Sequence, residues 1–243
     1  MARSWFYSFT MPDGQATPTY LQDQSIHTTR RDMLDAVLDD HLPGDRTALT
    51  CVDLACHEGF FALHLAHTGF GKVLGIDIRP ENIAGAKLIR AAQAAVNAEF
   101  VCRDVLGSDA SHLGQFDVVL MLGLLYHLEN PVGALRIARS LTRRICLIET
   151  VIGPNLTGTV DWGSRTHTKP ISGAFCVVDE AADVREGNRE ANVSAISLVP
   201  SLDALLFVMQ AVGFSHVAVA SPPQDGHEQL ASGQRALVLG LVD

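Results

Sequence analysis

The chain has 243 residues, 47% of them hydrophobic, and a formal net charge of −9. This length and hydrophobic share predict one large domain with a substantial core and exclude intrinsic disorder. The negative charge, with Lys72, Lys87 and Lys169 as the only lysines, argues against a nucleic-acid partner, because such partners require clustered cations.

No apolar run approaches membrane-spanning length, and the first ten residues lack the order of a secretory signal. We therefore expect a cytoplasmic protein without a membrane partner. Five cysteines form no C-x-x-C pair and are expected as reduced core residues rather than disulfides or zinc ligands. They are Cys51, Cys56, Cys102, Cys146 and Cys176, of which Cys56 is the candidate for a reactive thiol.

An aromatic-rich arm opens the chain and contains a Pro12-Asp13-Gly14 turn. Such an arm either folds over a pocket, where Trp5 and Tyr20 would contact a substrate, or packs on the edge of the domain. The apolar periodicity that follows predicts a helix over 29–41 that covers the edge of a cofactor site. Residues 1–45 are accordingly expected to form an arm and covering helix, and 46–243 the main domain.

From residue 48 the pattern alternates between strand and helix. Strands are predicted over 48–54, 72–77, 98–102, 116–122 and 144–149. The helices between them are predicted over 60–68, 80–96 and 132–141. Residues 151–199 lose this periodicity and are expected to form a substrate-covering insertion. A helix over 202–212 and two strands, 216–220 and 235–241, are expected to close the chain.

The first strand runs into a turn over 53–59 and then into a helix. Such a turn lets backbone N–H groups approach a nucleotide-like ligand, while an acid that ends the next strand, here Asp77, can accept from both ribose hydroxyls. A third acid, Asp104, follows the third strand. The turn alone also fits a generic strand-turn-helix, so the downstream acids carry the prediction.

This pattern resembles the class I S-adenosylmethionine-dependent methyltransferases, in which an acid is followed by three alternating glycines. Ala55, His57 and Gly59 stand at those three positions, so only the third glycine is retained. At His57, either the backbone alone lines the methionine end or the imidazole contacts the cofactor. The resemblance implies that Asp77 binds the ribose and Asp104 the adenine amino group. The full set of expected cofactor-binding residues is Asp53, Ala55, His57, Gly59, Asp77, Ile78, Asp104, Val105 and Leu122.

The segment Leu125-Tyr126-His127-Leu128, with Asn130-Pro131 after it, resembles the corresponding segment of bacterial tRNA wobble-uridine methyltransferases and their small-molecule relatives. The arm resembles that family too, so the likeness covers about 5–150. Members that transfer a carboxymethyl group need cations for the extra carboxylate, and this arm has no lysine, so S-adenosylmethionine itself is expected. The resemblance implies an α/β, Rossmann-like, doubly wound seven-stranded sheet with an antiparallel last strand.

Methyl transfer requires the protein to align the reactants, exclude water and, for a hydroxyl acceptor, remove a proton. His127 is the candidate base, with a purely structural histidine as the alternative, because imidazole titrates near working pH. Tyr126, His27 and Glu149 are further catalytic candidates. The substrate candidates are Trp5, Tyr20, Arg30, Trp162 and Arg165, and the two arginines suit a carboxylate or phosphate.

The sequence shows no metal-ligand cluster, so we expect metal-independent methyl transfer to a small-molecule acceptor, with oxygen favoured. A tRNA wobble-uridine-type methyltransferase and a non-catalytic S-adenosylmethionine-binding partner subunit remain alternatives, and a homodimer stays open. A serine hydrolase is excluded by the lack of a G-x-S-x-G turn. An NAD-dependent dehydrogenase would usually keep its glycines intact.

Overall fold

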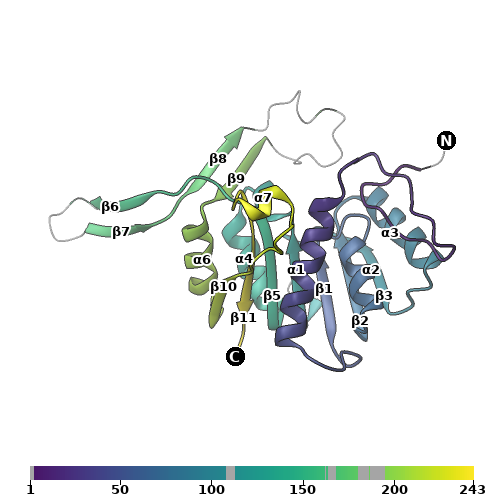
Figure 1. Ribbon diagram of the computed structural model, residues 1–243. Coiled ribbons are helices and arrows are strands. Elements are labelled where there is room, and N and C mark those ends of the chain that lie inside the picture. The colour runs from purple at the N-terminus through teal and green to yellow at the C-terminus, as the bar shows by residue number, and fades with distance from the viewer. Residues whose placement is uncertain (1–2, 108–112, 162, 164–167, 180–185, 187–194) are drawn as a thin grey trace.

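The computed structural model describes residues 3–107, 113–161, 163, 168–179, 186 and 195–243 (Figure 1). Its main sheet consists of β1 (Thr50–Leu54), β2 (Lys72–Asp77), β3 (Ala98–Cys102), β4 (Phe116–Leu122), β5 (Thr142–Val151), β10 (His216–Val219) and β11 (Arg235–Leu241). The strand order is β10-β11-β5-β4-β1-β2-β3. Neighbours from β5 to β3 run parallel, whereas β11 pairs antiparallel with β5 and β10. The predicted Rossmann-like α/β sheet with an antiparallel last strand is confirmed.

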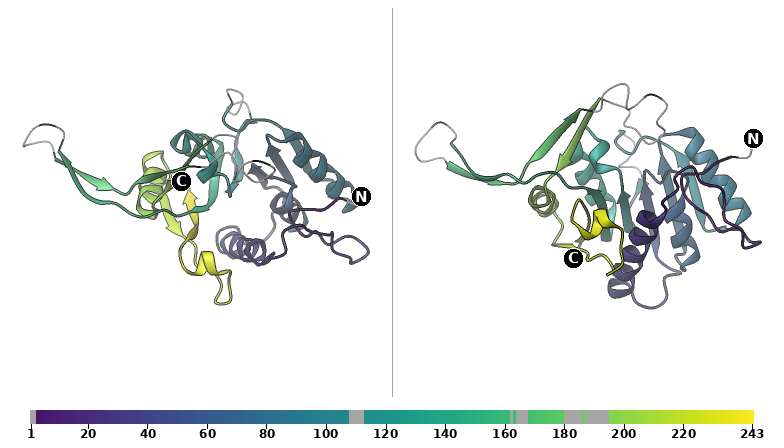
Figure 2. Two further views of the ribbon diagram at one scale, coloured as in Figure 1. Left: turned by 90° about the horizontal axis from the view of Figure 1, so that it is seen from above. Right: turned by 45° about the horizontal axis from the view of Figure 1, so that its top comes forward.

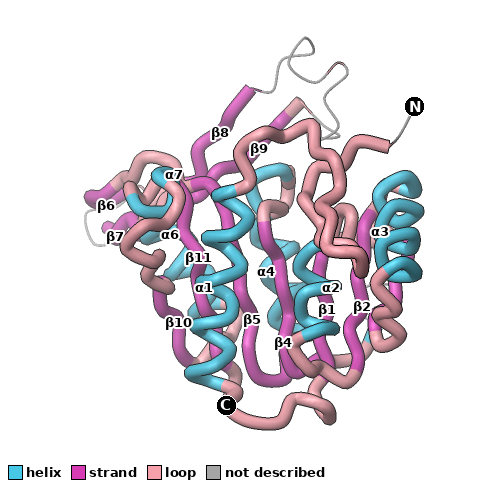
Figure 3. Tube along the Cα trace, turned by 45° about the vertical axis from the view of Figure 1, so that its right-hand side comes forward, coloured by secondary structure: helices cyan, strands magenta, loops and turns pink. Residues whose placement is uncertain are grey.

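Helices cover both faces of this sheet (Figures 1 and 3). On one face lie α1 (Ser25–His41), α2 (Phe60–His67) and α3 (Pro80–Ala92), and on the other lie α4 (Pro131–Leu141) and α6 (Leu202–Ala211). Successive residues of β4 alternate between the two cores: Val118 joins the first and Val119 the second. Because β4 is buried on both sides, its sequence is an unbroken apolar run.

Two helix boundaries differ from the prediction. α1 begins at Ser25, four residues early, because its first turns bury the polar side chains of His27, Thr29 and Arg30 instead of apolar ones. α3 ends at Ala92 and not near Val96, because Ala94 adopts a positive φ of 54°. The apolar periodicity therefore missed the first turn of α1, from Ser25 to Thr28.

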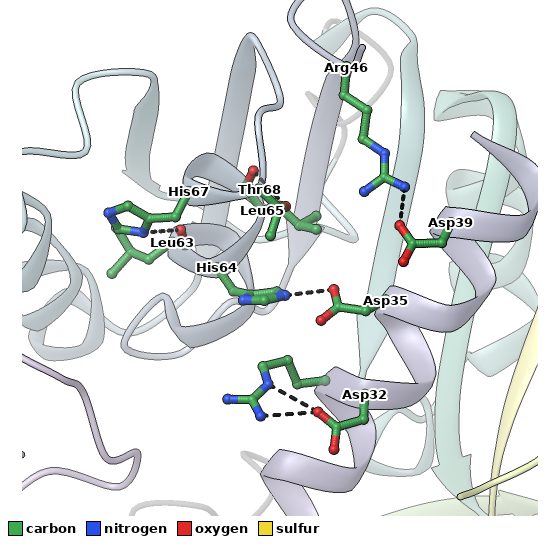
Figure 4. Close-up of polar contacts among 10 residues, drawn as sticks. Asp32, Asp35, Asp39, Arg46, Leu63, His64, Leu65, His67 and Thr68 are labelled. Atoms are coloured by element: carbon green, nitrogen blue, oxygen red, sulfur yellow. Dashed lines mark hydrogen bonds and ion pairs between the residues drawn. The ribbon is translucent and has the colours of Figure 1, made fainter. Parts of the chain in front are cut away.

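Side-chain contacts fix α1 against the domain (Figure 4). His64 Nε2 on α2 lies 2.7 Å from Asp35 Oδ1 on α1. Arg46, in the loop after α1, donates to Asp39 Oδ1 at 2.7 Å and to the Leu42 carbonyl at 3.0 Å. These contacts hold the covering helix in place and so position the residues on its first turns.

The expected insertion contains two antiparallel strand pairs instead of irregular chain. They are β6 (Thr157–Asp161) with β7 (Thr168–Ser172), and β8 (Phe175–Asp179) with β9 (Ile196–Pro200). The β6–β7 pair projects away from the main sheet in every view (Figures 1 and 2). All of β6 is exposed, so its sequence carries none of the in-out alternation that marks a half-buried strand.

All five cysteines are free thiols. Cys51, Cys56 and Cys146 are buried as predicted, but Cys102 is exposed. Burial raises the pKa of Cys56 well above its ordinary value, which argues against the reactive thiol considered from sequence. Among the described residues, no helix is long and apolar enough to cross a membrane.

Candidate functional site

A cavity of about 920 Å³ opens at the carboxyl ends of β1, β2 and β4. The arm and α1 form one wall, and the short 3₁₀ helix η2 (Leu125–His127) forms another. The segment from His227 to Arg235, which includes α7 (Glu228–Ala231), closes the site near β11. This volume is at the upper end for small-molecule sites, so there is room for a nucleotide-sized cofactor beside a second ligand.

The turn after β1 has alternating left-handed residues: φ is 60° at Ala55, 51° at His57 and 84° at Gly59. Positive φ favours glycine, so the three positions keep the backbone shape of a glycine-rich turn although two carry side chains. Ala55 and His57 line the cavity. Gly59 does not; a Cβ there would lie 2.7 Å from the Phe100 ring, so this glycine is required for packing.

The imidazole of His57 packs against the arm. Its ring centroid lies 5.0 Å from that of Phe6 and 5.5 Å from that of Tyr7. His57 therefore links the turn to the arm while also lining the cavity. The ring of His57 thus packs on the arm, with both of its nitrogens buried.

Asp77, at the end of β2, lines the cavity although most of its acceptor positions are occupied by hydrogen bonds from the protein. Its Oδ1 accepts from Arg79 N at 2.8 Å and from Asn82 Nδ2 at 3.2 Å, and its Oδ2 accepts from His57 N at 2.8 Å. A carboxylate has about four acceptor positions, so one on Oδ2 remains for a ligand hydroxyl.

The other expected cofactor residues divide into two groups. Ile78, Asp104, Val105 and Leu122 line the cavity, and Ile78 keeps half of its surface exposed there. Asp53, in contrast, is buried beneath the turn and does not line the cavity. Burial first, and the charge of Asp77 second, raise the pKa of Asp53 to about 8. Asp53 thus supports the turn from below, and the sequence pattern could not separate that role from ligand contact.

At the opposite end of the cavity, Arg235 organises the polar side chains. Its Nη2 donates to the Tyr126 hydroxyl at 3.2 Å, its Nη1 to Glu149 Oε1 at 3.0 Å, and its Nε to Gln229 Oε1 at 3.0 Å. Burial alone would lower the pKa of Arg235, but the charge of Glu149 and the hydrogen bonds to Tyr126 and Glu149 outweigh it and raise the pKa. Tyr126 and His127 both line this end.

Glu149, a catalytic candidate from sequence, occupies a structural position instead. It is completely buried and does not line the cavity. Arg30 Nη2 lies 3.2 Å from its Oε1 and 3.1 Å from its Oε2, and Arg235 shares Oε1. Because Glu149 is buried outside the cavity and bound by two guanidinium groups, it is not placed to remove a proton from an acceptor.

His27 lines the cavity from α1, and neither ring nitrogen has a hydrogen-bond partner. Burial, followed by the charge of Arg30, lowers its pKa to about 3. It is therefore neutral at pH 7 and a weak proton acceptor. Its ring packs 4.5 Å from Tyr7 and 4.9 Å from Phe6, which makes it part of the aromatic wall.

Of the substrate candidates, Tyr20 and Arg30 line the cavity. Trp5 does not, because it is buried beside α3, where Arg3 stacks 4.3 Å from its ring centroid. Trp162 and Arg165 lie outside the described residues. The prediction also missed Arg235 and Gln229, whose only sequence signal was polar side chains close to the last apolar strand.

Residues 45–168, just over half of the 243-residue chain, match a family model described as a methyltransferase domain. The chain belongs to this methyltransferase family. The methyltransferase is 32% identical over 105 residues to the O-antigen chain terminator bifunctional methyltransferase/kinase WbdD of Escherichia coli, which covers 43% of the chain and 15% of that protein. It is also 32% identical over 92 residues to the ubiquinone biosynthesis O-methyltransferase of Escherichia coli O7:K1 (strain IAI39), which covers 38% of each. The matches thus span less than half the length of these curated relatives.

Solved structures confirm the fold of the methyltransferase over nearly its whole length. The N-terminal domain of EvdMO1 with S-adenosylhomocysteine bound has a TM-score of 0.72 at 23% identity, covering 98% of this chain and 92% of that one. Magnesium protoporphyrin IX methyltransferase from Synechocystis PCC 6803 with bound S-adenosylhomocysteine has a TM-score of 0.55 at 17% identity, covering 95% and 90%. Both neighbours hold S-adenosylhomocysteine, and the likeness shows that this chain has the same fold as they have.

Proposed function

We propose that the methyltransferase transfers the methyl group of S-adenosylmethionine to a hydroxyl oxygen of a small-molecule acceptor, without a metal ion. The observation that carries this proposal is a single cavity with ribose- and adenine-type contacts, Asp77 and Asp104, at one end and Tyr126 with His127 at the other. The ubiquinone O-methyltransferase relative supports oxygen as the acceptor atom.

The cofactor fits the end of the cavity formed by β1 to β3. Ala55 and His57 would border its methionine end, and the open acceptor position of Asp77 would take a ribose hydroxyl. Ile78, Val105 and Leu122 offer apolar surface to the adenine, beside Asp104. When bound, S-adenosylmethionine supplies an electrophilic methyl group on a sulfonium, so the protein has to orient the acceptor and manage its proton.

For proton removal we propose His127, which lines the cavity directly after β4. Tyr126 receives a hydrogen bond from Arg235 and keeps its own hydroxyl proton to donate to an acceptor oxygen. Within the described part of the chain, no group of three His, Cys, Asp or Glu side chains is placed to hold a metal ion. Histidine-assisted transfer therefore fits the residues present.

The proposed domain roles follow from the same walls. The arm and α1 cover the cavity directly, whereas no described residue of 151–199 lines it. β9 does pack against η2, so the insertion supports the acceptor end from behind.

The net charge of −9 makes an RNA acceptor less favourable than a small molecule.

Calorimetry with S-adenosylhomocysteine, followed by transfer of an isotope-labelled methyl group to a panel of phenols, sugars and hydroxy acids, tests this function. We expect cofactor binding and label in an ether product. Failure to bind the cofactor at millimolar concentration would contradict the whole proposal. Binding with no transfer to any acceptor, tRNA included, would favour a non-catalytic partner subunit.

A further inference from the structure

Three charged side chains from distant parts of the chain meet at the acceptor end of the cavity. Glu149 Oε1 accepts from Arg30 Nη2 at 3.2 Å and from Arg235 Nη1 at 3.0 Å. Two guanidinium groups share one carboxylate, so the cluster carries one uncompensated positive charge. Both arginines line the cavity and Glu149 does not, which means that the positive side faces the ligand space.

This excess charge is buried. Arg30 is only 6% exposed, and its Nε has no hydrogen-bond partner. A desolvated cation with an unused donor costs free energy unless an anion or acceptor completes it. The guanidinium fork is also the side chain best matched to a planar carboxylate.

The neighbouring groups do not supply the missing negative charge. His27, on the same helix as Arg30, is neutral at pH 7 because of its burial. Tyr126 offers Arg235 a neutral hydroxyl oxygen, and Gln229 offers it an amide oxygen. The acid Asp23 also lines the cavity, but it is two-thirds exposed and lies 3.8 Å from His227 Nε2.

We infer that the acceptor carries a carboxylate and that Arg30 and Arg235 bind it, which orients the acceptor for reaction beside Tyr126 and His127. This inference rests on the proposed methyl transfer and specifies its substrate class as hydroxy acids or related anionic molecules. The cavity also has an aromatic wall, formed by Phe6, Tyr7 and His27, which suits a phenyl or other flat group on the acceptor.

The methionine carboxylate of the cofactor is the other source of such an anion. The sheet order favours the acceptor: Arg235 begins β11, which lies three strands from β1 in the order β11-β5-β4-β1. At the usual strand spacing this corresponds to about 14 Å of sheet width between the Arg235 backbone and the cofactor turn, and to about 10 Å from Glu149 on β5, where both guanidinium groups lie. Tyr126, which accepts a hydrogen bond from Arg235, follows β4, the strand that lies between β5 and β1.

The first experiment titrates full-length protein, labelled with ¹⁵N-arginine and saturated with S-adenosylhomocysteine, with benzoate and separately with benzamide. We expect benzoate to shift the Arg30 and Arg235 Nε–H resonances and to bind at least tenfold more tightly than benzamide. Equal binding of the two probes, or shifts at neither arginine, would overturn the inference.

Variants test which side chains carry the preference. Arg235→Gln should reduce the benzoate-over-benzamide preference at least tenfold, whereas Arg235→Lys, which retains the charge next to Glu149, should keep part of it. Arg103→Gln removes another cavity-lining arginine, at the far end beside Asp104, and should leave the preference unchanged. An equal loss in Arg235→Gln and Arg103→Gln would mean that the cavity attracts anions only generally.

A third arm separates the two sources of the carboxylate. S-adenosylhomocysteine and 5′-methylthioadenosine differ in the amino-acid portion, which only the former contains. If S-adenosylhomocysteine shifts the Arg30 and Arg235 resonances and 5′-methylthioadenosine does not, the pair binds the cofactor carboxylate and the acceptor assignment fails. If S-adenosylhomocysteine does not bind at all, the proposed methyl transfer is contradicted. This outcome is distinct from a failure of the carboxylate assignment, in which the cofactor analogue still binds.

Discussion

The carboxylate of Glu58 accepts a hydrogen bond from the backbone N–H of Phe6 at 2.9 Å. Glu58 is buried in the turn after β1, and it also lies 3.2 Å from Arg3 Nη2. One side chain therefore fastens the arm to the cofactor turn. Since Phe6 and Tyr7 line the cavity, this contact holds part of the cavity wall in place.

Replacement of Glu58 should loosen the arm. In Glu58→Ala the Phe6 N–H loses its acceptor, which costs about 1–3 kcal/mol when the group stays buried. We expect calorimetry to show about tenfold weaker binding of S-adenosylhomocysteine, together with faster proteolysis within residues 3–20. Glu81→Ala is the matched control, because Glu81 is exposed and contacts Arg3 only through its backbone carbonyl. Unchanged affinity in Glu58→Ala would contradict a role of the arm in binding.

The turn after β1 should respond in opposite ways to two substitutions. Ala55→Gly removes a left-handed alanine and should stabilise the protein by roughly 0.5 kcal/mol, after the entropy cost of glycine. Gly59→Ala should destabilise it by more than about 1 kcal/mol, because the new methyl group would meet the Phe100 ring. Urea unfolding measures both. A stabilised Gly59→Ala would show that Phe100 moves aside easily.

Asp53 should make stability depend on pH. Its folded-state pKa of about 8 lies above the ordinary value of 3.8, so the folded state retains a proton that the unfolded chain releases. Its contribution is complete below about pH 4 and is lost as pH rises towards 8, at no more than about 1.4 kcal/mol per pH unit. Asp53→Asn should therefore flatten the fall in unfolding free energy between pH 5 and 8. Asp40→Asn, 81% exposed at its side chain, should not.

His27 should act in the opposite direction on the acid side. Its folded-state pKa of about 3 lies below the ordinary 6.5, so the unfolded chain binds a proton first as pH falls. The stability from neutral His27 is complete above pH 6.5 and declines below it, by about 2 kcal/mol at pH 5. His27→Phe keeps a ring beside Tyr7 and should lose less stability between pH 7 and 5. Parallel pH profiles of the two proteins would contradict this.

His127→Ala should separate turnover from binding. If His127 removes the acceptor proton, kcat should fall by a factor of about 10²–10⁴, while the Kd of S-adenosylhomocysteine changes little. His216→Ala, an exposed histidine on β10, serves as the control and should behave like the unmodified enzyme. Full turnover in His127→Ala would leave His127 with a packing role only.

The sheet, and the strand-end acids that line the cavity, were predictable because they follow from local rules. Buried strands such as β4 can be recognised from their apolar composition. Acids at strand ends, such as Asp77 and Asp104, lie at the same edge of any parallel sheet. Those two side chains do line the cavity, as expected. The glycine spacing also singled out Ala55 and His57, and both adopt a positive φ although neither is a glycine.

The acceptor end was not predictable in the same way. Arg235 reaches Glu149 and Tyr126 only because β11 inserts antiparallel beside β5, and that register is a property of the whole sheet. Residue spacing also does not show which acids are buried away from the cavity. Glu149 and Asp53 lie near strand ends like Asp77, yet neither faces the cavity. Sequence pattern placed these acids at the correct edge but could not tell which way each one points.

The cluster of Arg30, Glu149 and Arg235 also bears on the order in which the protein folds. Glu149 meets Arg30 across 119 positions of the chain and Arg235 across 86. Loops of that length close slowly, because their entropy is lost before the contacts they permit are formed. β1 to β4 can therefore assemble while the acceptor end is still missing. The docking of β11 is then the step that brings Arg235 to Glu149 and Tyr126 and completes this wall of the cavity.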